Sequence, residues 1–235
     1  MNLLSRKIGV WGDSILKGVV IDDVKGTYSM LKSNCVSLFE QQLDFPVLNR
    51  SRFGFTISKG YRHLASALER GLSCDLVLLE YGGNDCDYDW AAVSADPDGN
   101  HHPNTPLSSF TQTLEKMIDT LRKNSIEPLL MSLPPINSDK YFKFLVSKGH
   151  DASALLHFLG DVNHIYQHHE AYSLEITKAA FQHNCYYVPV REAFLSSGKS
   201  RDFICLDGIH PNQEGHQVMQ RVFKDYAAKL IHAPS

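Results

Sequence analysis

Short apolar runs alternate with helical stripes along this chain, and this alternation constrains its fold more than any other feature. Strands are predicted where the apolar runs are short and continuous, at residues 7–11, 47–51, 76–81, 128–132 and 186–190. Helical spacing lies between and after them, as in the final stripe of Met219, Val222, Tyr226 and Leu230. Strands that alternate with helices are typical of parallel sheets. We therefore predict a flavodoxin-like, doubly wound sheet of five parallel strands with helices on both faces.

The length and charge of the chain limit its organisation and its partners. A chain of 235 residues, 43% of them hydrophobic, can bury a full core, and we expect a single domain over residues 1–235. The net charge is −3, and basic residues form no run longer than a pair. This pattern argues against binding of nucleic acid or of an anionic membrane. We expect a small-molecule partner, with no stable membrane association; the sequence does not indicate an oligomeric state.

Cysteine usage and hydropathy favour a cytoplasmic location. The five cysteines are scattered and form no C-x-x-C pair, which is typical of reduced thiols. Residues 1–7 lead straight into the first predicted strand and leave no room for the apolar region of a secretion signal. No apolar stretch approaches the length of a membrane span.

Two distant segments carry the residues of a serine hydrolase. A Gly-Asp-Ser turn at residues 12–14 follows the first predicted strand, and an Asp-Gly-Ile-His segment lies at residues 207–210. A serine hydroxyl is a weak nucleophile at neutral pH, so acyl transfer needs an imidazole to accept its proton and a carboxylate to orient the imidazole. Ser14, His210 and Asp207 can fill these three roles. We predict them as the catalytic residues.

The local sequence around each segment supports this prediction. Gly12 permits a sharp turn after the strand, so Ser14 is expected at the carboxyl edge of the sheet, where ligands bind in open α/β folds. Pro211 is a favoured first helical residue and keeps His210 out of the helical region, on the loop that enters the last helix. Asp207 can reach the imidazole from the same loop.

Four separated blocks together resemble the SGNH (GDSL-type) hydrolase family of lipases, esterases and thioesterases. The blocks are the turn at 12–14, with Ile15 where leucine is commonest, then Gly54, the Gly-Gly-Asn-Asp segment at 82–85, and the segment at 207–210. They occur in the family order over essentially the whole chain. The resemblance implies the SGNH hydrolase fold, which has the same strand order.

The resemblance also implies an oxyanion hole. In this family pattern the donors are the backbone N–H of Ser14, the backbone N–H of Gly54 and the side-chain amide of Asn84. Fixed neutral donors stabilise the transition state preferentially, because negative charge on the oxygen develops only during the reaction. Neither a metal nor an organic cofactor is implied.

Two segments are longer than simple connections require. Residues 86–106 are polar and follow the Asn84 block, so we expect a long loop beside the active site. Residues 133–184 are expected to form a helical, lid-like insertion on the catalytic edge. Aromatic residues in these segments suit either the lining of a substrate pocket or ordinary packing, and the sequence favours neither: Tyr88, Trp90, Tyr141, Phe142 and Phe144.

Other polar residues near these blocks have simpler interpretations. Asp13 and Asp85 are expected to brace the turns that hold Ser14 and Asn84. The histidine pairs at 101–102 and 168–169 lack the spacing of metal ligands, so we expect solvent-facing histidines and no metal site.

The sequence therefore predicts a serine esterase that acts through an acyl-enzyme on Ser14. Short-acyl esters of a soluble compound are the favoured substrates, because no membrane-binding stripe indicates a lipid-surface enzyme. A lysophospholipase or an acyl-thioesterase of the same family is the alternative. A non-catalytic binding protein on this fold is a remote one, since no triad residue is missing. The glycine motifs of nucleotide-binding proteins do not follow any predicted strand.

Overall fold

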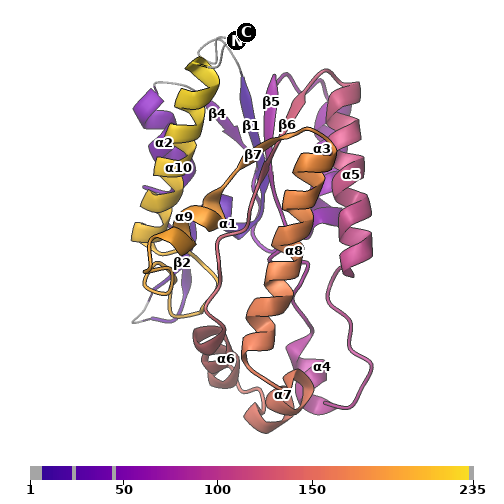
Figure 1. Cartoon of the computed structure of the whole chain (residues 1–235). Helices are drawn as coiled ribbons and strands as arrows, with labels where there is room; N and C mark the ends of the chain where they lie inside the picture. Colours follow the sequence, from indigo (N-terminus) through magenta and orange to yellow (C-terminus); the bar gives the residue numbers. More distant parts are fainter. Residues whose placement is uncertain (1–6, 23–24, 44–45, 233–235) are drawn as a thin grey trace.

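The computed structural model describes residues 7–22, 25–43 and 46–232, and these form a three-layer α/β fold (Figure 1). The central sheet has five parallel strands in the order β4-β1-β5-β6-β7. Its strands are β1 (Ile8–Gly12), β4 (Val47–Asn49), β5 (Leu76–Glu80), β6 (Glu127–Met131) and β7 (Tyr186–Val188). The predicted flavodoxin-like sheet is confirmed, and each strand begins within one residue of its predicted start.

Continuous apolar runs form the central strands because helices cover both faces of the sheet. All residues of β1 and β5 are buried. Ile8 and Val10 face one hydrophobic core, whereas Trp11 faces the other. Successive side chains of a strand point to opposite faces, so a single run contributes to both cores.

Two layers of helices enclose the sheet (Figure 1). One layer consists of α2 (Cys35–Leu43), α9 (Val190–Ser196) and α10 (Gln213–His232). The other consists of α3 (Ile57–Glu69), α5 (Leu107–Lys123) and α8 (Asn163–Gln182). The predicted apolar stripes of α5 and α10 pack inward, with Phe110 and Met219 fully buried. The side chain of Leu230 and residues 1–6, which entered the predictions, lie outside the described part of the structure.

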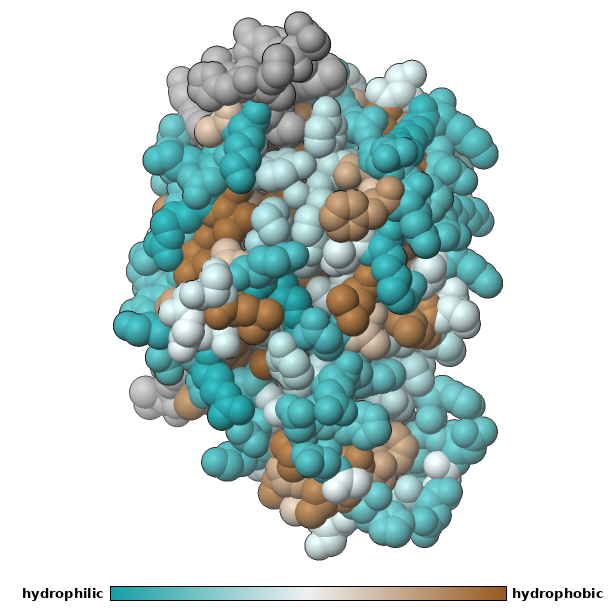
Figure 2. Space-filling view, in the orientation of Figure 1, coloured by the Kyte–Doolittle hydropathy of each residue, from teal (hydrophilic) through white to brown (hydrophobic). Residues whose placement is uncertain are grey.

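Three further helices lie beyond the carboxyl ends of the strands (Figure 1). They are α4 (Trp90–Ala95), α6 (Ser138–Ser147) and α7 (Ala152–Leu159). With the start of α8 they form a third hydrophobic cluster that includes Trp90, Tyr141 and Leu155. Figure 2 shows apolar side chains gathered at this end of a mostly hydrophilic face.

The prediction of one long loop over residues 86–106 is wrong, because α4 lies inside it. Asp89 caps this helix by accepting a hydrogen bond from the Ala92 N–H at 3.0 Å. Trp90 and Val93, one helical turn apart, are both buried. A short helix with a single buried turn is stabilised by its tertiary contacts, which local sequence patterning does not reveal.

The segment at 133–184 also differs from a simple insertion. Its last helix, α8, packs on α5 and on β6 and β7 as the crossover helix of the sheet. Only α6 and α7 are additional to the minimal fold, and they lie at the predicted edge (Figure 1). That they move as a lid stays a prediction.

A small hairpin follows the first turn of the chain and was not predicted. Strands β2 (Val19–Ile21) and β3 (Tyr28–Met30) pair antiparallel after the short helix α1 (Ser14–Lys17). All of β3 is exposed, so it lacks the alternating pattern by which strands are recognised.

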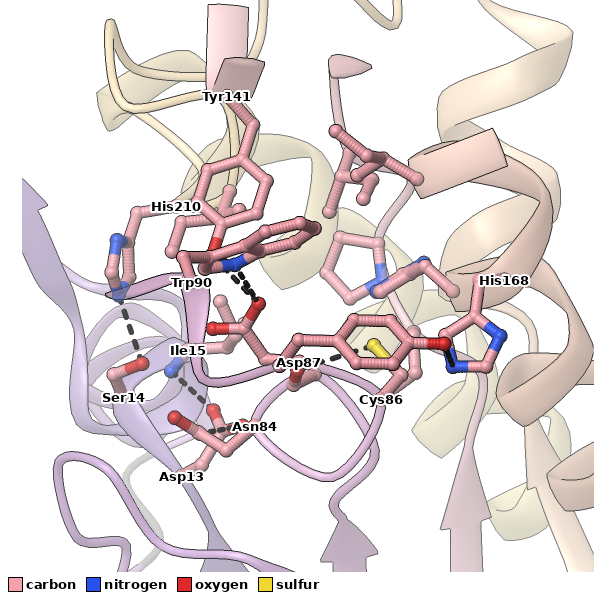
Figure 3. Close-up of a pocket in the computed structure, with 18 of the residues that line it drawn as sticks. Asp13, Ser14, Ile15, Asn84, Cys86, Asp87, Trp90, Tyr141, His168 and His210 are labelled. Carbon is pink, nitrogen blue, oxygen red and sulfur yellow. Dashed lines mark hydrogen bonds between the residues drawn. The ribbon is translucent and has the colours of Figure 1, made fainter. Parts of the chain in front are cut away.

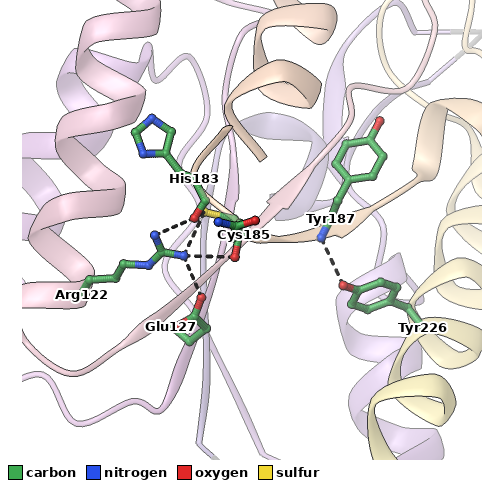
Figure 4. A network of polar contacts seen from close by, with 7 residues as sticks. Arg122, Glu127, His183, Cys185, Tyr187 and Tyr226 are labelled. Carbon is green, nitrogen blue, oxygen red and sulfur yellow. Dashed lines mark hydrogen bonds and ion pairs between the residues drawn. The ribbon is translucent and has the colours of Figure 1, made fainter. Parts of the chain in front are cut away.

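The opposite end of the sheet is held by polar contacts (Figure 4). Arg122 at the end of α5 donates to the main-chain oxygens of His183 and Asn184 at 2.7 and 3.2 Å, and it pairs with Glu127 at 3.2 Å. These contacts join α5 and β6 to the turn between α8 and β7. No described helix is long and apolar enough to span a membrane.

Candidate active site

Ser14 lies at the carboxyl end of β1, as the first residue of α1. Asp13 caps this turn, because its Oδ1 accepts a hydrogen bond from the Ile15 N–H at 2.8 Å. Gly12 is required by close packing, since a Cβ there would lie 2.9 Å from Oε2 of Glu80. The Ser14 side chain is 6% exposed and faces the cavity described below (Figure 3).

His210 joins Ser14 to Asp207 in one hydrogen-bonded chain. The Ser14 hydroxyl lies 2.8 Å from His210 Nε2 and donates to it, and His210 Nδ1–H donates to Asp207 Oδ2 at 2.6 Å. Asp207 Oδ1 accepts the main-chain N–H groups of Ile209 and His210, both at 3.1 Å. Asp207 is fully buried and His210 is 3% exposed. The carboxylate is therefore fixed by its own loop and orients the imidazole toward the serine.

The loop that carries His210 is held in place by close packing. Gly208 has φ of +80°, and a Cβ there would lie 2.3 Å from the backbone nitrogen of Tyr141 in α6. Glycine is the residue that tolerates both this conformation and this approach. The Cys205 N–H donates to the His210 carbonyl oxygen at 2.8 Å and closes the loop. The extra helix α6 thereby supports the position of the imidazole.

Asn84 approaches Ser14 from the loop after β5. Its side-chain amide donates to Asp13 Oδ2 at 2.9 Å, so Asp13 braces both the serine turn and this amide (Figure 3). Asp85 also has the bracing role predicted for it. Both of its oxygens accept the Ile57 N–H at 3.0 Å, which ties the Asn84 loop to the start of α3.

Gly54 lies in the turn after β4, and it has φ of +68°, which favours glycine. Its neighbour Phe53 lines the cavity beside Ser14. The Arg52 N–H donates to the Gly12 carbonyl oxygen at 3.0 Å, so this turn is anchored to the end of β1. The structure thus places the second block, which contains Gly54, next to the serine turn, and the role of the Gly54 N–H stays a prediction.

A group of buried carboxyls lies behind the serine turn, and one member was not predicted. Glu80, at the end of β5, is 1% exposed and accepts the Asp13 N–H at 3.3 Å. Burial raises the pKa of Glu80 well above its usual range, and the nearby Asp13 charge raises it further. Burial likewise raises the pKa of Asp13, although hydrogen bonds from Ile15 and Asn84 oppose this. Burial raises the pKa of Asp85 to about 7.

The sequence did contain a signal for Glu80. It is a charged residue at the end of a strand whose other residues, Leu76 to Leu79, are all apolar. A carboxyl in a continuous buried run needs a polar partner. Asp13 supplies that partner through its main-chain N–H, which donates to Glu80 Oε2 at 3.3 Å.

A cavity of about 190 Å³ opens beside Ser14 and extends under the extra helices (Figure 3). Three of the predicted aromatic residues, Tyr88, Trp90 and Tyr141, line it. Phe142 and Phe144 pack instead against the third hydrophobic cluster. Asp13, Glu80, Asp87 and Asp207 lie at or next to this cavity, whereas the described residues that line it include neither lysine nor arginine.

Asp87 organises the aromatic wall. Its Oδ1 accepts hydrogen bonds from Trp90 Nε1 at 2.7 Å and from the Tyr141 hydroxyl at 2.8 Å. These bonds join α4 to α6 across the cavity. Burial raises the pKa of Asp87, and the hydrogen bonds from Tyr141 and Trp90 act in the opposite direction.

The prediction of solvent-facing histidines is wrong for the pair on α8. His169 is 4% exposed, and burial lowers its pKa well below the usual value. His168 is half-buried, lines the cavity, and lies 3.4 Å from the Tyr88 hydroxyl (Figure 3). Adjacent histidines have no helical period, so the sequence pattern does not show which of them faces the core. Within the described ranges, no group of three metal-binding side chains gathers.

Two aromatic rings that the sequence did not single out flank His210. Tyr28 of β3 contacts the imidazole edge-on with ring centroids 5.3 Å apart, and Phe53 lies nearly parallel to it at 6.3 Å. Burial is the main cause that raises the pKa of Tyr28, and the nearby Asp207 charge raises it further. Both rings come from segments far from residue 210, and only tertiary structure brings them together.

A doubly wound α/β sheet with a hydrogen-bonded Ser, His and Asp at its carboxyl edge defines an ester-hydrolase class of protein. The chain belongs to the GDSL-like lipase/acylhydrolase family, whose model matches residues 10–218. It is accordingly an ester-hydrolysing enzyme, and the resemblance found in its sequence is confirmed.

Solved structures of low sequence identity share this fold. A lipase/acylhydrolase from Enterococcus faecalis is 18% identical with a TM-score of 0.66, covering 95% of this chain and 96% of that one. The acetylxylan esterase Axe2 from Geobacillus stearothermophilus, as a catalytic mutant, is 17% identical with a TM-score of 0.65, covering 95% and 94%. The psychrotrophic esterase EstA from Pseudoalteromonas is 17% identical with a TM-score of 0.63, covering 97% and 100%. No curated protein matched the chain by sequence.

Proposed function

We propose that this protein is a serine esterase that hydrolyses carboxylic esters through an acyl-enzyme on Ser14. The observation that carries the proposal is the 2.8 Å contact between the Ser14 hydroxyl and His210 Nε2, with Asp207 held 2.6 Å from the other ring nitrogen. This arrangement supplies a nucleophile, a general base and a carboxylate that fixes the imidazole tautomer.

The reaction proceeds in two balanced halves. His210 accepts the hydroxyl proton as Ser14 Oγ attacks the carbonyl carbon, and then returns that proton to the departing alcohol. The acyl group is left on Ser14. A water molecule then gives a proton to His210 as it attacks the acyl-enzyme, and the same proton returns to Ser14 when the carboxylic acid leaves.

Three donors are proposed for the oxyanion: the main-chain N–H groups of Ser14 and Gly54 and the side-chain amide of Asn84. An amide nitrogen has two hydrogens, and Asn84 uses one on Asp13 at 2.9 Å. The second hydrogen is available to a tetrahedral intermediate on Ser14. Asp13 thus fixes the direction of the amide before substrate binds, which is the preorganisation that electrostatic catalysis requires.

Short-acyl esters of a soluble compound are the proposed substrates. The cavity of about 190 Å³ is lined by side chains of α4, α6 and α7, including Trp90, Tyr141 and Phe158, and such a small lined space favours an acetyl or butyryl group over a decanoyl chain. One structural neighbour is an acetylxylan esterase, which is consistent with a small acyl group. A lysophospholipase or acyl-thioesterase is the alternative, but a cavity lined by carboxyls and lacking lysine or arginine is unsuited to a phosphate-bearing substrate. A binding protein without activity is the remote alternative.

We further propose that the protein acts in the cytoplasm on a small-molecule ester, without nucleic acid or stable membrane association. The five cysteines are free thiols, which fits this location.

An acyl-chain series of p-nitrophenyl esters tests the proposed function. We expect kcat/KM to be highest for acetyl to butyryl esters and to fall for decanoyl esters, because the longer chain exceeds the cavity. Phe158 of α7 lines the far part of the cavity, so Phe158→Ala should shift the optimum to longer chains. A wild-type optimum at long acyl chains would contradict the short-acyl assignment, and absence of both ester turnover and fluorophosphonate labelling would favour the binding protein.

A further inference from the structure

Two exposed aromatic rings form the rim of the active site on the His210 side. Tyr28 is 42% exposed and Phe53 is 52% exposed, and their ring centroids lie 5.5 Å apart. Both rings contact the imidazole of His210, and both line the mouth of the cavity. Single exposed hydrophobic side chains are common on proteins, but two that touch each other and a buried, hydrogen-bonded imidazole mark a binding surface.

The chemistry of ester hydrolysis decides which part of a substrate meets these rings. This step rests on the proposed function. The departing alcohol must take its proton from His210 Nε2, so its oxygen must come within about 3 Å of that nitrogen. The group bonded to that oxygen then lies against whatever flanks the imidazole. On the outer side, those flanking groups are Tyr28 and Phe53.

The acyl group has a different place. From Ser14 and His210 the cavity extends toward Trp90 of α4, Tyr141 of α6 and His168 of α8 (Figure 3), and Leu133, Phe158 and Ile165 also line it. Asn84 lies on this inner side of Ser14. An ester that bonds to Ser14 Oγ therefore has its acyl group in the enclosed cavity and its alcohol on the open rim.

We propose that Tyr28 and Phe53 form the subsite for the leaving alcohol, and that this subsite takes a flat, largely apolar ring. The face of an aryl ring and the apolar face of a pyranose share this chemistry. A ring that lies on partly exposed aromatic faces gains both apolar burial and the specific geometry of ring contacts. Among the described residues that line the neighbouring cavity, carboxyls occur and lysine and arginine do not, which favours a neutral alcohol over an anionic one.

Phe53 is the better residue for a test. Tyr28 lies against His210 and close to the Asp207 charge, so a change of Tyr28 alters the surroundings of this pair as well as the rim. Phe53 contacts His210 only through its ring. Phe181 supplies a matched control, because it is 73% exposed and its ring contacts Tyr187, at the other end of the sheet from Ser14.

The experiment compares 2-phenylethyl acetate with 2-cyclohexylethyl acetate. The two esters give the same acetyl-enzyme, and their alcohols are similar in size and basicity but differ in flatness. We expect wild-type kcat/KM to favour the phenyl ester, and Phe53→Ala to lower the phenyl-to-cyclohexyl ratio by roughly three- to tenfold. Phe53→Leu, which keeps apolar bulk without a ring, should lower the ratio in the same direction. Phe181→Ala should leave it unchanged.

A third substrate, an acetylated methyl xyloside, separates the two sources of a flat ring. A larger loss on the xyloside than on the phenyl ester in Phe53→Ala assigns the rim to a sugar, and the reverse assigns it to an aryl alcohol. An unchanged phenyl-to-cyclohexyl ratio together with an unchanged xyloside rate in Phe53→Ala would overturn the subsite. Absence of both turnover and fluorophosphonate labelling in the wild-type enzyme would instead remove the proposed function on which the subsite rests.

Discussion

Two groups of carboxylates lie on opposite sides of Ser14, and they differ in their partners. Asp207 is fully buried and is matched by the imidazole of His210 at 2.6 Å and by two main-chain N–H groups. Asp13 and Glu80 are each 1% exposed. The hydrogen-bond donors to their carboxyl groups are neutral amides: the main-chain N–H groups of Asp13 and Ile15 and the side chain of Asn84. A carboxyl that lacks a cationic partner is more easily protonated when it is buried.

This difference teaches how one kind of side chain serves two functions around a single nucleophile. Beside a titratable imidazole, a carboxylate holds a tautomer and stabilises the imidazolium that forms during the reaction. Beside amides, a carboxylate holds neutral donors in place. In the proposed mechanism, proton transfer therefore belongs to the His210 side of Ser14 and positioning of the oxyanion donor to the Asp13 side.

Removal of the shared nucleophile should have the largest effect. We expect Ser14→Ala to lower kcat by roughly 10⁴- to 10⁶-fold, because no acyl-enzyme can form. The thermal midpoint should change little, since the change deletes one small hydroxyl. Esterase assays and thermal unfolding of the same preparation measure both. Undiminished turnover in the folded variant would end the acyl-enzyme mechanism.

The His210 side should show the next largest effect. Asp207→Asn replaces the acceptor of His210 Nδ1–H with a group that favours the wrong tautomer, so we expect kcat to fall roughly 10³- to 10⁴-fold. The pH dependence of kcat/KM provides the readout that a merely structural role would not change. If Asp207→Asn and Asp13→Asn altered kcat and its pH profile equally, the contrast between the two sides would fail.

Changes on the Asp13 side of Ser14 should lower kcat less, because they act through the Asn84 amide that Asp13 holds. We expect Asn84→Ala to lower kcat by roughly 10²- to 10³-fold with little change in KM, the usual consequence of removing one oxyanion donor. Fluorophosphonate labelling should persist, because the serine, histidine and aspartate are intact. A rise in KM at constant kcat would make Asn84 a ground-state substrate contact instead.

Glu80 gives the smallest expected effect on activity and a distinct effect on stability. The pKa values of Glu80 and Asp13 are raised in the folded protein, and that of Asp85 is raised to about 7. The folded state therefore binds more protons than the unfolded state above the ordinary carboxyl range. The resulting stability is present at low pH and is lost as pH rises through the raised pKa values.

The Glu80→Gln variant isolates this contribution. An amide can donate to Asp13 without titrating, so we expect a small change in kcat and a flatter dependence of unfolding free energy on pH. The difference in slope between variant and wild type should be on the order of 1 kcal/mol per pH unit at pH values above the ordinary carboxyl range and below the raised pKa of Glu80. Urea unfolding at several pH values measures it. Identical slopes would show that Glu80 is ionised equally in both states.

The sheet and the positions of the segments that carry Ser14, Asn84 and His210 could be predicted from the sequence, because both depend on local patterns. A strand buried on both faces is a continuous apolar run, and a turn residue after such a run lies at the sheet edge. The His210 and Asp207 pair lies within one short loop, so its spacing alone indicates a contact. These features need no knowledge of distant packing.

The remaining features depend on contacts between distant segments. Tyr28 lies on a fully exposed strand, and its link to Asp207 spans most of the chain. The short helix α4 is stabilised by α6 and α7, and the burial of His169 follows from the rotation of α8 against the sheet. The role of Glu80 was missed because this residue ends an apolar strand and its partner, Asp13, follows a different strand. Patterns within one segment of the sequence do not reveal such pairs.

The most direct test of the account is covalent labelling of the wild-type enzyme with a fluorophosphonate, followed by peptide mapping and a parallel esterase assay. The account predicts one adduct, on Ser14, with activity lost in proportion to labelling and with labelling strongly reduced in Asp207→Asn. Retained esterase activity in protein fully labelled at Ser14, or an adduct at another residue that tracks the loss of activity, would contradict it.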